Sequence, residues 1–195
     1  MTFALLLFLL PLAHSPGPGN LFFAAAGARF GLRATWAATL GYHLATWLVT
    51  AAIGFSSLVA LAGAPGLFTA IRIAGVAYVL WIAFGFLRAG SGIGQAAAPS
   101  VRFLDGAVLL LLNPKAYVII ALMFSQFLPS GGADQAEAIL WITTVFTLNN
   151  LLAFTLWTLL GAQLARLFQA PTAGRWVNIV MGCLLAVVAL WMALA

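Results

Sequence analysis

Residues 15–20, with the sequence SPGPGN, interrupt an apolar run that extends over residues 3–27. Pro16 and Pro18 have no backbone N–H group, and their rings would clash with the carbonyls four residues earlier, so a regular helix cannot continue through them. The two glycines between and after these prolines make the same backbone more flexible. We therefore expect two half-helices here, with unpaired backbone polar groups between them.

The composition indicates where this broken helix lies. Of the 195 residues, 65% are hydrophobic and only 6% are charged, whereas a soluble domain has about a quarter charged residues. A lipid bilayer accepts such a chain as helices of about 20 apolar residues, because their backbone hydrogen bonds close internally. The sequence therefore predicts an all-α integral membrane protein. Its net charge of +5 comes from scattered arginines, so we expect no nucleic-acid binding, which needs clustered basic residues.

Apolar runs separated by charged residues or by Gly and Pro predict six transmembrane helices. Their approximate bounds are 3–27, 36–62, 68–87, 103–128, 138–164 and 176–194. Residues 89–100 are rich in glycine, have no apolar core and predict a linker near the midpoint of the chain. The helices then form two sets of three, about 1–90 and 100–195, within a single transmembrane domain that covers residues 1–195.

Basic residues indicate the orientation, because cytoplasmic loops of membrane proteins collect Lys and Arg. The second connection contains only Arg72, the fourth contains Asp134 and Glu137, and the odd-numbered connections contain six arginines: Arg29, Arg33, Arg88, Arg102, Arg166 and Arg175. We therefore expect both termini in the periplasm of a bacterial inner membrane. With three helices per half, the second half enters the membrane inverted, as in transporters built from inverted repeats.

The predicted fourth helix has a matching interruption at Asn113, Pro114 and Lys115. Interruptions at corresponding places in two inverted halves indicate a substrate site at the bilayer midplane. Half-helix N-termini present N–H groups to a carboxylate, and freed carbonyls accept hydrogen bonds from an ammonium group, so two breaks suit an amino acid. The alternative is that the prolines only kink helices for packing.

Lys115 is the only charged residue deep in a predicted span, and such a charge costs at least about 2.5 kcal/mol at a helix centre. It either pairs with a substrate carboxylate or lines a polar cavity, unless it reaches an interface instead. No Asp or Glu lies deep in a span, so His14 and His43 are the proton-coupling candidates. These histidines and the Asn149–Asn150 pair could also simply bond across helices. The candidate substrate-binding residues are Ser15, Pro16, Gly17, Pro18, Gly19, Asn20, Asn113, Pro114, Lys115 and Asn149.

With these motifs the sequence resembles the LysE/RhtB family of amino-acid exporters over nearly its whole length. The residues that carry the resemblance are 15–20 (SPGPGN), 27–33 (GARFGLR), 75 with 77–81 (AYVLW), and 112–116 (LNPKA). The segment 174–180 looks most like the branch that exports cysteine and O-acetylserine. The resemblance implies efflux of amino acids or close metabolites driven by the proton gradient, without a cofactor, and is compatible with a homodimer.

Two departures from the family pattern bear on the substrate. Many members have an acidic residue in the second helix where this sequence has Ala45 and Thr46, and Gly19 replaces a frequent asparagine. Without a buried carboxylate to receive a second ammonium group, the sequence favours neutral zwitterionic substrates over lysine or arginine.

Two other classes remain as alternatives. An intramembrane hydrolase would need a nucleophile with a base, and Ser15 adjoins His14, but sequence neighbours on a helix do not face each other. The sequence also has no Gly-x-Ser-x-Gly elbow and no metal-binding histidine cluster. A passive channel or membrane-assembly subunit is the second alternative, although channels are usually lined by polar rings from several subunits.

Overall fold

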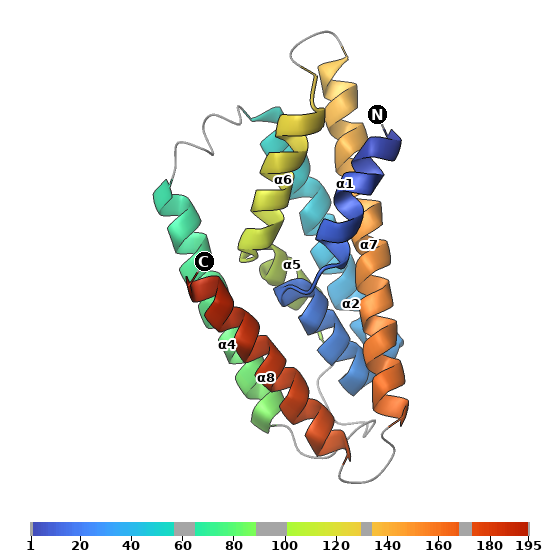
Figure 1. Ribbon diagram of the computed structural model, residues 1–195, viewed down its shortest axis with the longest axis vertical. Coiled ribbons are helices and arrows are strands. Elements are labelled where there is room, and N and C mark those ends of the chain that lie inside the picture. The colour runs from blue at the N-terminus through green and yellow to red at the C-terminus, as the bar shows by residue number, and fades with distance from the viewer. Residues whose placement is uncertain (1, 57–64, 89–100, 130–133, 168–172, 195) are drawn as a thin grey trace.

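The computed structural model describes residues 2–56, 65–88, 101–129, 134–167 and 173–194, and within these the chain is helical with no strand. The helices are α1 (Thr2–His14), α2 (Pro18–Phe55), α4 (Pro65–Arg88), α5 (Phe103–Leu111), α6 (Pro114–Phe127), α7 (Gln135–Leu167) and α8 (Ala173–Leu194) (Figure 1). The all-α prediction is thereby confirmed. The linker predicted at 89–100 lies outside the described residues.

Both predicted interruptions are confirmed. Helix α1 ends at His14 and α2 begins at Pro18. Helices α5 and α6 are separated only by residues 112 and 113 and are bent by 62° relative to each other. In both cases a proline is the first residue of the second helix, where its missing N–H group costs nothing because that group would have no intrahelical partner.

Gly31 reverses the chain inside α2, with φ 77° and ψ 171°. This backbone conformation is accessible to glycine and strained for other residues. It divides α2 into two arms, 18–30 and 32–55. Gly19 faces Phe154, Gly27 faces Thr158 further along α7, and Tyr42 lies against Phe154 again, so both arms pack along α7 in opposite directions.

Several predicted boundaries were wrong. Arg29 and Arg33 do not lie in an open connection, because a single glycine turn joins the two helical arms. Helix α2 ends at Phe55, and residues 57–64 of the predicted second span lie outside the described residues. Arg72, assigned from sequence to a connection, lies inside α4, and Glu137 lies in the first turn of α7. Hydrogen bonding continues a helix beyond its apolar segment, so charged residues mark its ends only loosely.

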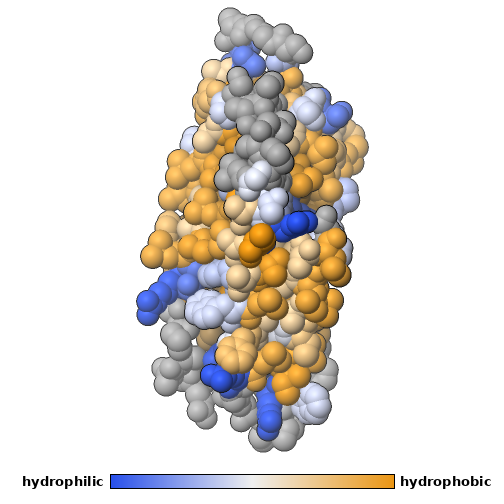
Figure 2. Space-filling view, turned by 90° about the vertical axis from the view of Figure 1, so that its left-hand side faces the viewer, coloured by the Kyte–Doolittle hydropathy of each residue, from blue (hydrophilic) through white to orange (hydrophobic). Residues whose placement is uncertain are grey.

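Three of the described helices are long and apolar enough to cross a membrane, namely Pro18–Phe55, Thr69–Arg88 and Gln135–Arg166, and the bent pair α5–α6 makes a fourth if it counts as one span. Thr2–His14 and Asn178–Leu194 are apolar but shorter. The predicted count of six spans is therefore not decided by helix length. The surface agrees with a membrane location, because hydrophobic residues make up most of the coloured surface on the side of α4 and α8 (Figure 2).

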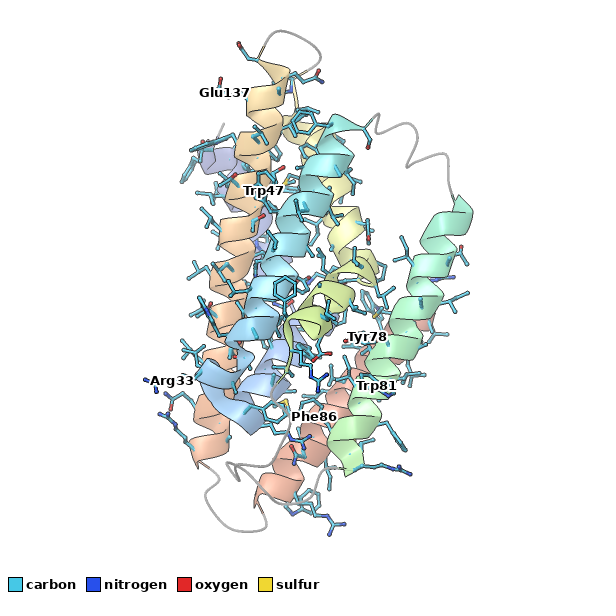
Figure 3. The ribbon with its side chains drawn as sticks, turned by 180° about the vertical axis from the view of Figure 1, so that it is seen from behind. Arg33, Trp47, Tyr78, Trp81, Phe86 and Glu137 are labelled. Atoms are coloured by element: carbon cyan, nitrogen blue, oxygen red, sulfur yellow. The ribbon has the colours of Figure 1, made fainter. Side chains whose placement is uncertain are left out.

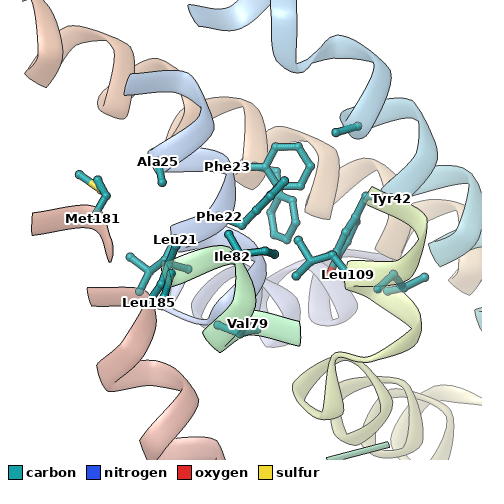
Figure 4. Packing of buried hydrophobic residues seen from close by; sticks show 14 of the residues in the cluster. Leu21, Phe22, Phe23, Ala25, Tyr42, Val79, Ile82, Leu109, Met181 and Leu185 are labelled. Atoms are coloured by element: carbon teal, nitrogen blue, oxygen red, sulfur yellow. The ribbon is translucent and has the colours of Figure 1, made fainter. Parts of the chain in front are cut away.

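The helices pack as two main groups, α2 with α7 and α5, and α4 with α8, as Figure 1 shows. Glycines allow the backbones of the first group to touch. A side chain at Gly27 would meet the Thr158 carbonyl, and one at Gly41 would meet the Phe103 carbonyl. Between the groups, a core that includes Phe22, Leu109 and Ile82 joins α2, α5 and α4 (Figure 4).

Candidate functional site

The two helix breaks meet in space. Lys115, at the start of α6, donates hydrogen bonds from Nζ to the Ser15 carbonyl and to Ser15 Oγ, both at 2.9 Å. Gly17 makes room for this contact, because a Cβ atom there would lie 3.0 Å from Lys115 Cδ and 3.1 Å from Nζ. Two segments 100 residues apart in the chain are thus joined by one cationic side chain.

The Lys115 charge is stabilised by the end of α1. Its two hydrogen-bond acceptors are neutral oxygens of Ser15. Ser15 directly follows α1, whose C-terminal carbonyls carry partial negative charge because they lack intrahelical partners. Since these acceptors are dipoles and not a carboxylate, a ligand carboxylate would be the stronger partner for the ammonium group.

The remaining free carbonyls at the end of α1 have side-chain partners. Asn20 Nδ2 donates to the Ala13 carbonyl at 2.9 Å, and Trp157 Nε1 donates to the His14 carbonyl at 3.2 Å. Ser15 Oγ donates to the Leu12 carbonyl at 3.0 Å. The first break is therefore a built structure that α2 and α7 hold open, and not a simple kink.

The second break is held by tyrosines. Asn113 Nδ2 donates to the Tyr42 hydroxyl at 3.1 Å, and Tyr117 donates from its hydroxyl to the Leu111 carbonyl at 3.0 Å. The Tyr42 hydroxyl also interacts with the Asn150 side chain. Asn113 Oδ1 is buried and has no hydrogen-bond partner within the described part of the chain. The second break, which lies beside the first break, thus contains a hydrogen-bond acceptor that has no partner among the described residues.

A cavity of about 420 Å³ opens beside these breaks between α1, α4, α6 and α8. We name it the break cavity, and its lining includes Leu12, Arg72, Pro114, Lys115, Trp191 and Met192. Two cations face it and no acidic residue is among its lining residues. Its remaining wall is mostly apolar. A ligand with an anionic group and an apolar body matches this lining.

The other residues predicted for the site lie apart from the break cavity. His43 and Asn149 are buried between α2 and α7 and do not line it. The His43 ring contacts the Thr39 carbonyl through Nδ1 at 2.7 Å, whereas His43 Nε2 and Asn149 Nδ2 have no hydrogen-bond partner among the described residues. These polar residues of α2 and α7 therefore lie on the Tyr42 side of the breaks, away from the break cavity.

His14 and Ser15 do not form a nucleophile–base pair. The His14 ring contacts the Leu10 carbonyl through Nδ1 at 2.9 Å. Ser15 Oγ instead contacts Lys115 and the Leu12 carbonyl. The geometry gives no support to a hydrolase.

Three residues at the breaks were not predicted from the sequence: Arg72, Tyr42 and Trp157. Arg72 was counted as an orientation signal, although it lies within the predicted span 68–87, and a charge inside an apolar run is itself a site signal. Tyr42 and Trp157 carry a polar atom within apolar runs, but nothing in their local sequence indicates that these atoms reach a break.

The sequence profile of the LysE type translocator family matches residues 10–195. The chain belongs to this family. An uncharacterised membrane protein of Vibrio cholerae is 30% identical over 176 residues, covering 86% of this chain and 84% of the relative. A leucine efflux protein of Enterobacter sp. is 27% identical over 159 residues, 77% of this chain and 74% of the relative.

A cysteine/O-acetylserine efflux protein of Escherichia coli K12 is 27% identical over 179 residues, 89% of this chain and 87% of the relative. No solved structure matches the chain. Family membership confirms the predicted resemblance and makes the chain a membrane translocator and not an enzyme.

Proposed function

We propose that this translocator exports small, neutral amino acids or closely related metabolites across the bacterial inner membrane, and that the substrate binds at the two helix breaks. The observation that carries the proposal is the contact of Lys115 with Ser15 beside the break cavity. The relatives named as leucine and cysteine/O-acetylserine efflux proteins support the substrate class.

The binding step is an exchange of partners. The substrate carboxylate accepts hydrogen bonds from the Lys115 ammonium group, and Arg72 lies on the same cavity wall. Lys115 then releases the Ser15 carbonyl, which becomes free to accept a hydrogen bond from the substrate ammonium group. Because the carboxylate carries a full negative charge whereas the Ser15 oxygens are neutral dipoles, the exchange strengthens the electrostatic contact of Lys115 and favours a zwitterion.

The lining of the break cavity favours a neutral side chain. A substrate such as lysine would bring a second ammonium group to a cavity that already holds Arg72 and Lys115 and has no acidic lining residue. Like charges repel strongly where water is scarce. Leu12, Val118 and Trp191 would instead contact an apolar or small polar side chain.

The proposal includes six spans in two inverted halves and periplasmic termini. Helix α1 with the first arm of α2 forms the first span, and α5 with α6 forms the fourth, so the breaks fall at corresponding places. Each half then has three spans, as transporters with inverted repeats have. A homodimer is compatible with this arrangement.

We also propose proton coupling through His43. Its ring is buried beside Tyr42 and Phe154, and Nε2 has no hydrogen-bond partner in the described chain. His14, the second candidate, contacts the Leu10 carbonyl and is partly exposed. The His43 ring contacts Tyr42, whose hydroxyl accepts the hydrogen bond from Asn113 at the second break. Export driven by a pH gradient should be lost in His43→Gln and retained in His14→Gln.

The test is uptake of a panel of labelled amino acids into inverted vesicles under an imposed pH gradient. We expect saturable uptake of neutral amino acids by the native chain. Lys115→Ala should lower uptake at least about tenfold, since a hydrogen bond to a charged group contributes about 1.5–3 kcal/mol. Pro16→Ala, which lets α1 continue into the break, should lower it as well.

Arg166→Ala is the matched control, because Arg166 is an exposed cation at the end of α7. Native-like uptake by both Lys115→Ala and Pro16→Ala would refute the site. Uptake that does not saturate and does not respond to the pH gradient would instead indicate a passive channel.

A further inference from the structure

A second cavity, of about 260 Å³, lies between the first arm of α2, α4 and the start of α5. We name it the arginine–aspartate cavity, and its lining includes Phe22, Arg29, Tyr78, Trp81, Phe86 and Asp105. Tyr78, Trp81 and Phe86, which line this cavity, are labelled along α4 in Figure 3. The Tyr78 and Trp81 rings stack with centroids 5.8 Å apart. The wall is therefore largely aromatic, with one cation and one anion.

The two charged groups have separate partners. The Arg29 guanidinium carbon lies 5.0 Å from the centre of the Phe30 ring and 5.7 Å from that of Phe86. Asp105 Oδ2 accepts a hydrogen bond from the Arg102 backbone N–H at 2.7 Å. Aromatic contacts use the face of a guanidinium and leave its N–H edges for an anion. This hydrogen bond caps the N-terminus of α5. It uses one of the two carboxylate oxygens of Asp105 and leaves the other for a ligand.

A zwitterion matches this arrangement. Its anionic end would bind the N–H groups of Arg29, its ammonium group would bind Asp105, and its side chain would lie on the rings. Pockets for drug-sized ligands measure about 300–1,000 Å³. A cavity of 260 Å³ therefore suits a smaller ligand, of the size of one amino acid.

We propose that the arginine–aspartate cavity is a second amino-acid site, which loads substrate before it reaches the break cavity. This inference rests on the proposed function. Arg29 lines this cavity, Arg88 lies over the ring of its lining residue Phe84, and Arg102 directly follows its lining residue Val101. This arginine-rich end is the expected cytoplasmic end and thus the side from which an exporter takes its substrate.

Both cavities border helix α4, at different positions along it. Arg72 lines the break cavity and Tyr78 lines the arginine–aspartate cavity, six residues or about 9 Å further along the helix at about 1.5 Å per residue. Between them, Gly75 packs directly on the Leu112 carbonyl at the second break. A substrate that moves from one cavity to the other must open this contact between α4 and the α5–α6 break.

Equilibrium binding of tritiated L-leucine to purified protein in phosphatidylglycerol nanodiscs tests the inference. We expect two leucine molecules per native chain, one per Lys115→Ala chain, and none in the double variant Lys115→Ala, Asp105→Asn. Asparagine retains an oxygen that can accept the Arg102 N–H hydrogen bond, so Asp105→Asn removes the charge and keeps the cap.

A second variant guards against misfolding. Arg29→Gln should likewise reduce binding from two leucine molecules to one, while Arg29→Lys should restore part of the lost affinity. Arg166→Gln, which changes a cation outside both cavities, should still bind two.

The outcomes separate this inference from the proposed function. One leucine per native chain, or none per Lys115→Ala chain, overturns the second site while a saturable transport activity would stand. If the number of leucine molecules bound per native chain falls from two to one when phosphatidylethanolamine is added, the arginine–aspartate cavity binds a lipid headgroup. This result overturns its role in transport. No binding and no transport of any amino acid by the native chain overturns both.

Discussion

Gly17 determines whether Lys115 can reach the first break. Its φ of −166° is extended backbone that any residue adopts, so its role is to leave space for Lys115 and not to relieve strain. The atoms that a new Cβ would meet are Lys115 Cδ at 3.0 Å and Nζ at 3.1 Å, the far end of a flexible side chain. The Lys115 side chain can move away from the new Cβ atom, but it would then lose its hydrogen bonds to Ser15.

We therefore predict that Gly17→Ala favours substrate binding. The variant has already lost the contact between Lys115 and Ser15 that the substrate must break, so the KM for export should fall about tenfold, which corresponds to about 1.4 kcal/mol, the order of one hydrogen bond to a charged group. The melting temperature in detergent should stay near that of the native protein. A variant with native KM would show that the substrate does not have to break this contact.

Two threonines lie in the seam between α2 and α7 without hydrogen-bond partners among the described residues. Thr50 and Thr143 are fully buried, and neither hydroxyl group has a hydrogen-bond partner there. We predict that Thr50→Val and Thr143→Val leave stability unchanged or raise it, because valine replaces a hydroxyl whose burial costs about 1–3 kcal/mol. Thermal unfolding in detergent measures this.

Thr46→Val is the matched control. Its hydroxyl donates to the Tyr42 carbonyl at 2.8 Å. Its loss should lower stability by about 0.5–1.5 kcal/mol. If both partnerless threonines prove more costly to replace than Thr46, their hydroxyls take part in interactions such as bound water.

At the scale of the helices, glycine contacts hold the α2–α7 group together. Gly27 and Gly161 bring the backbones of the first α2 arm and α7 into contact, since a Cβ at either position would collide with a carbonyl of the facing helix. Backbone atoms cannot move aside as a flexible side chain can. These two positions therefore set the distance between the helices that support the first break.

We predict that Gly27→Ala and Gly161→Ala each destabilise the protein by about 1–3 kcal/mol, the usual cost of overpacking. Gly66→Ala is the control, because nothing lies within 4 Å of its Cβ position in α4. It should be neutral or slightly stabilising, as alanine favours helix more than glycine does. Equal melting temperatures for all three variants would contradict this account of the packing.

The breaks could be predicted from the sequence because proline and glycine act on their own backbone. Pro16, Pro18 and Pro114 interrupt helices whatever surrounds them. The turn near Gly31 was predicted only as a connection between the spans 3–27 and 36–62, since the sequence around Arg29 and Arg33 does not indicate that a single glycine makes the turn. The contact between Ser15 and Lys115 depends on how α1 and α6 pack, which local sequence does not encode.

For the whole molecule, charge sets the expected orientation in the membrane. Arg33 and Glu137 lie toward opposite ends of the bundle (Figure 3). The positive-inside rule assigns the arginine end to the cytoplasm. Cys183, the only cysteine, is exposed and must be replaced before other positions are labelled.

We predict that, in a Cys183→Ser background, an impermeant maleimide added to spheroplasts labels Glu137→Cys and not Arg33→Cys. Permeabilised membranes should label both positions, which controls for accessibility. The reverse pattern in intact spheroplasts would invert the proposed topology and the direction of transport through the two cavities.

The account depends on the substrate taking Lys115 away from Ser15, and the sequence offers a direct probe, because Lys115 is its only lysine. The measurement is the rate at which an amine-reactive ester modifies Lys115 in purified protein, followed by mass spectrometry, with the N-terminal amine as internal control. We predict that a transported amino acid slows modification of Lys115 saturably, with half-protection near the KM for export, and leaves the N-terminal amine unaffected. An unchanged rate for Lys115 at saturating substrate would contradict the account.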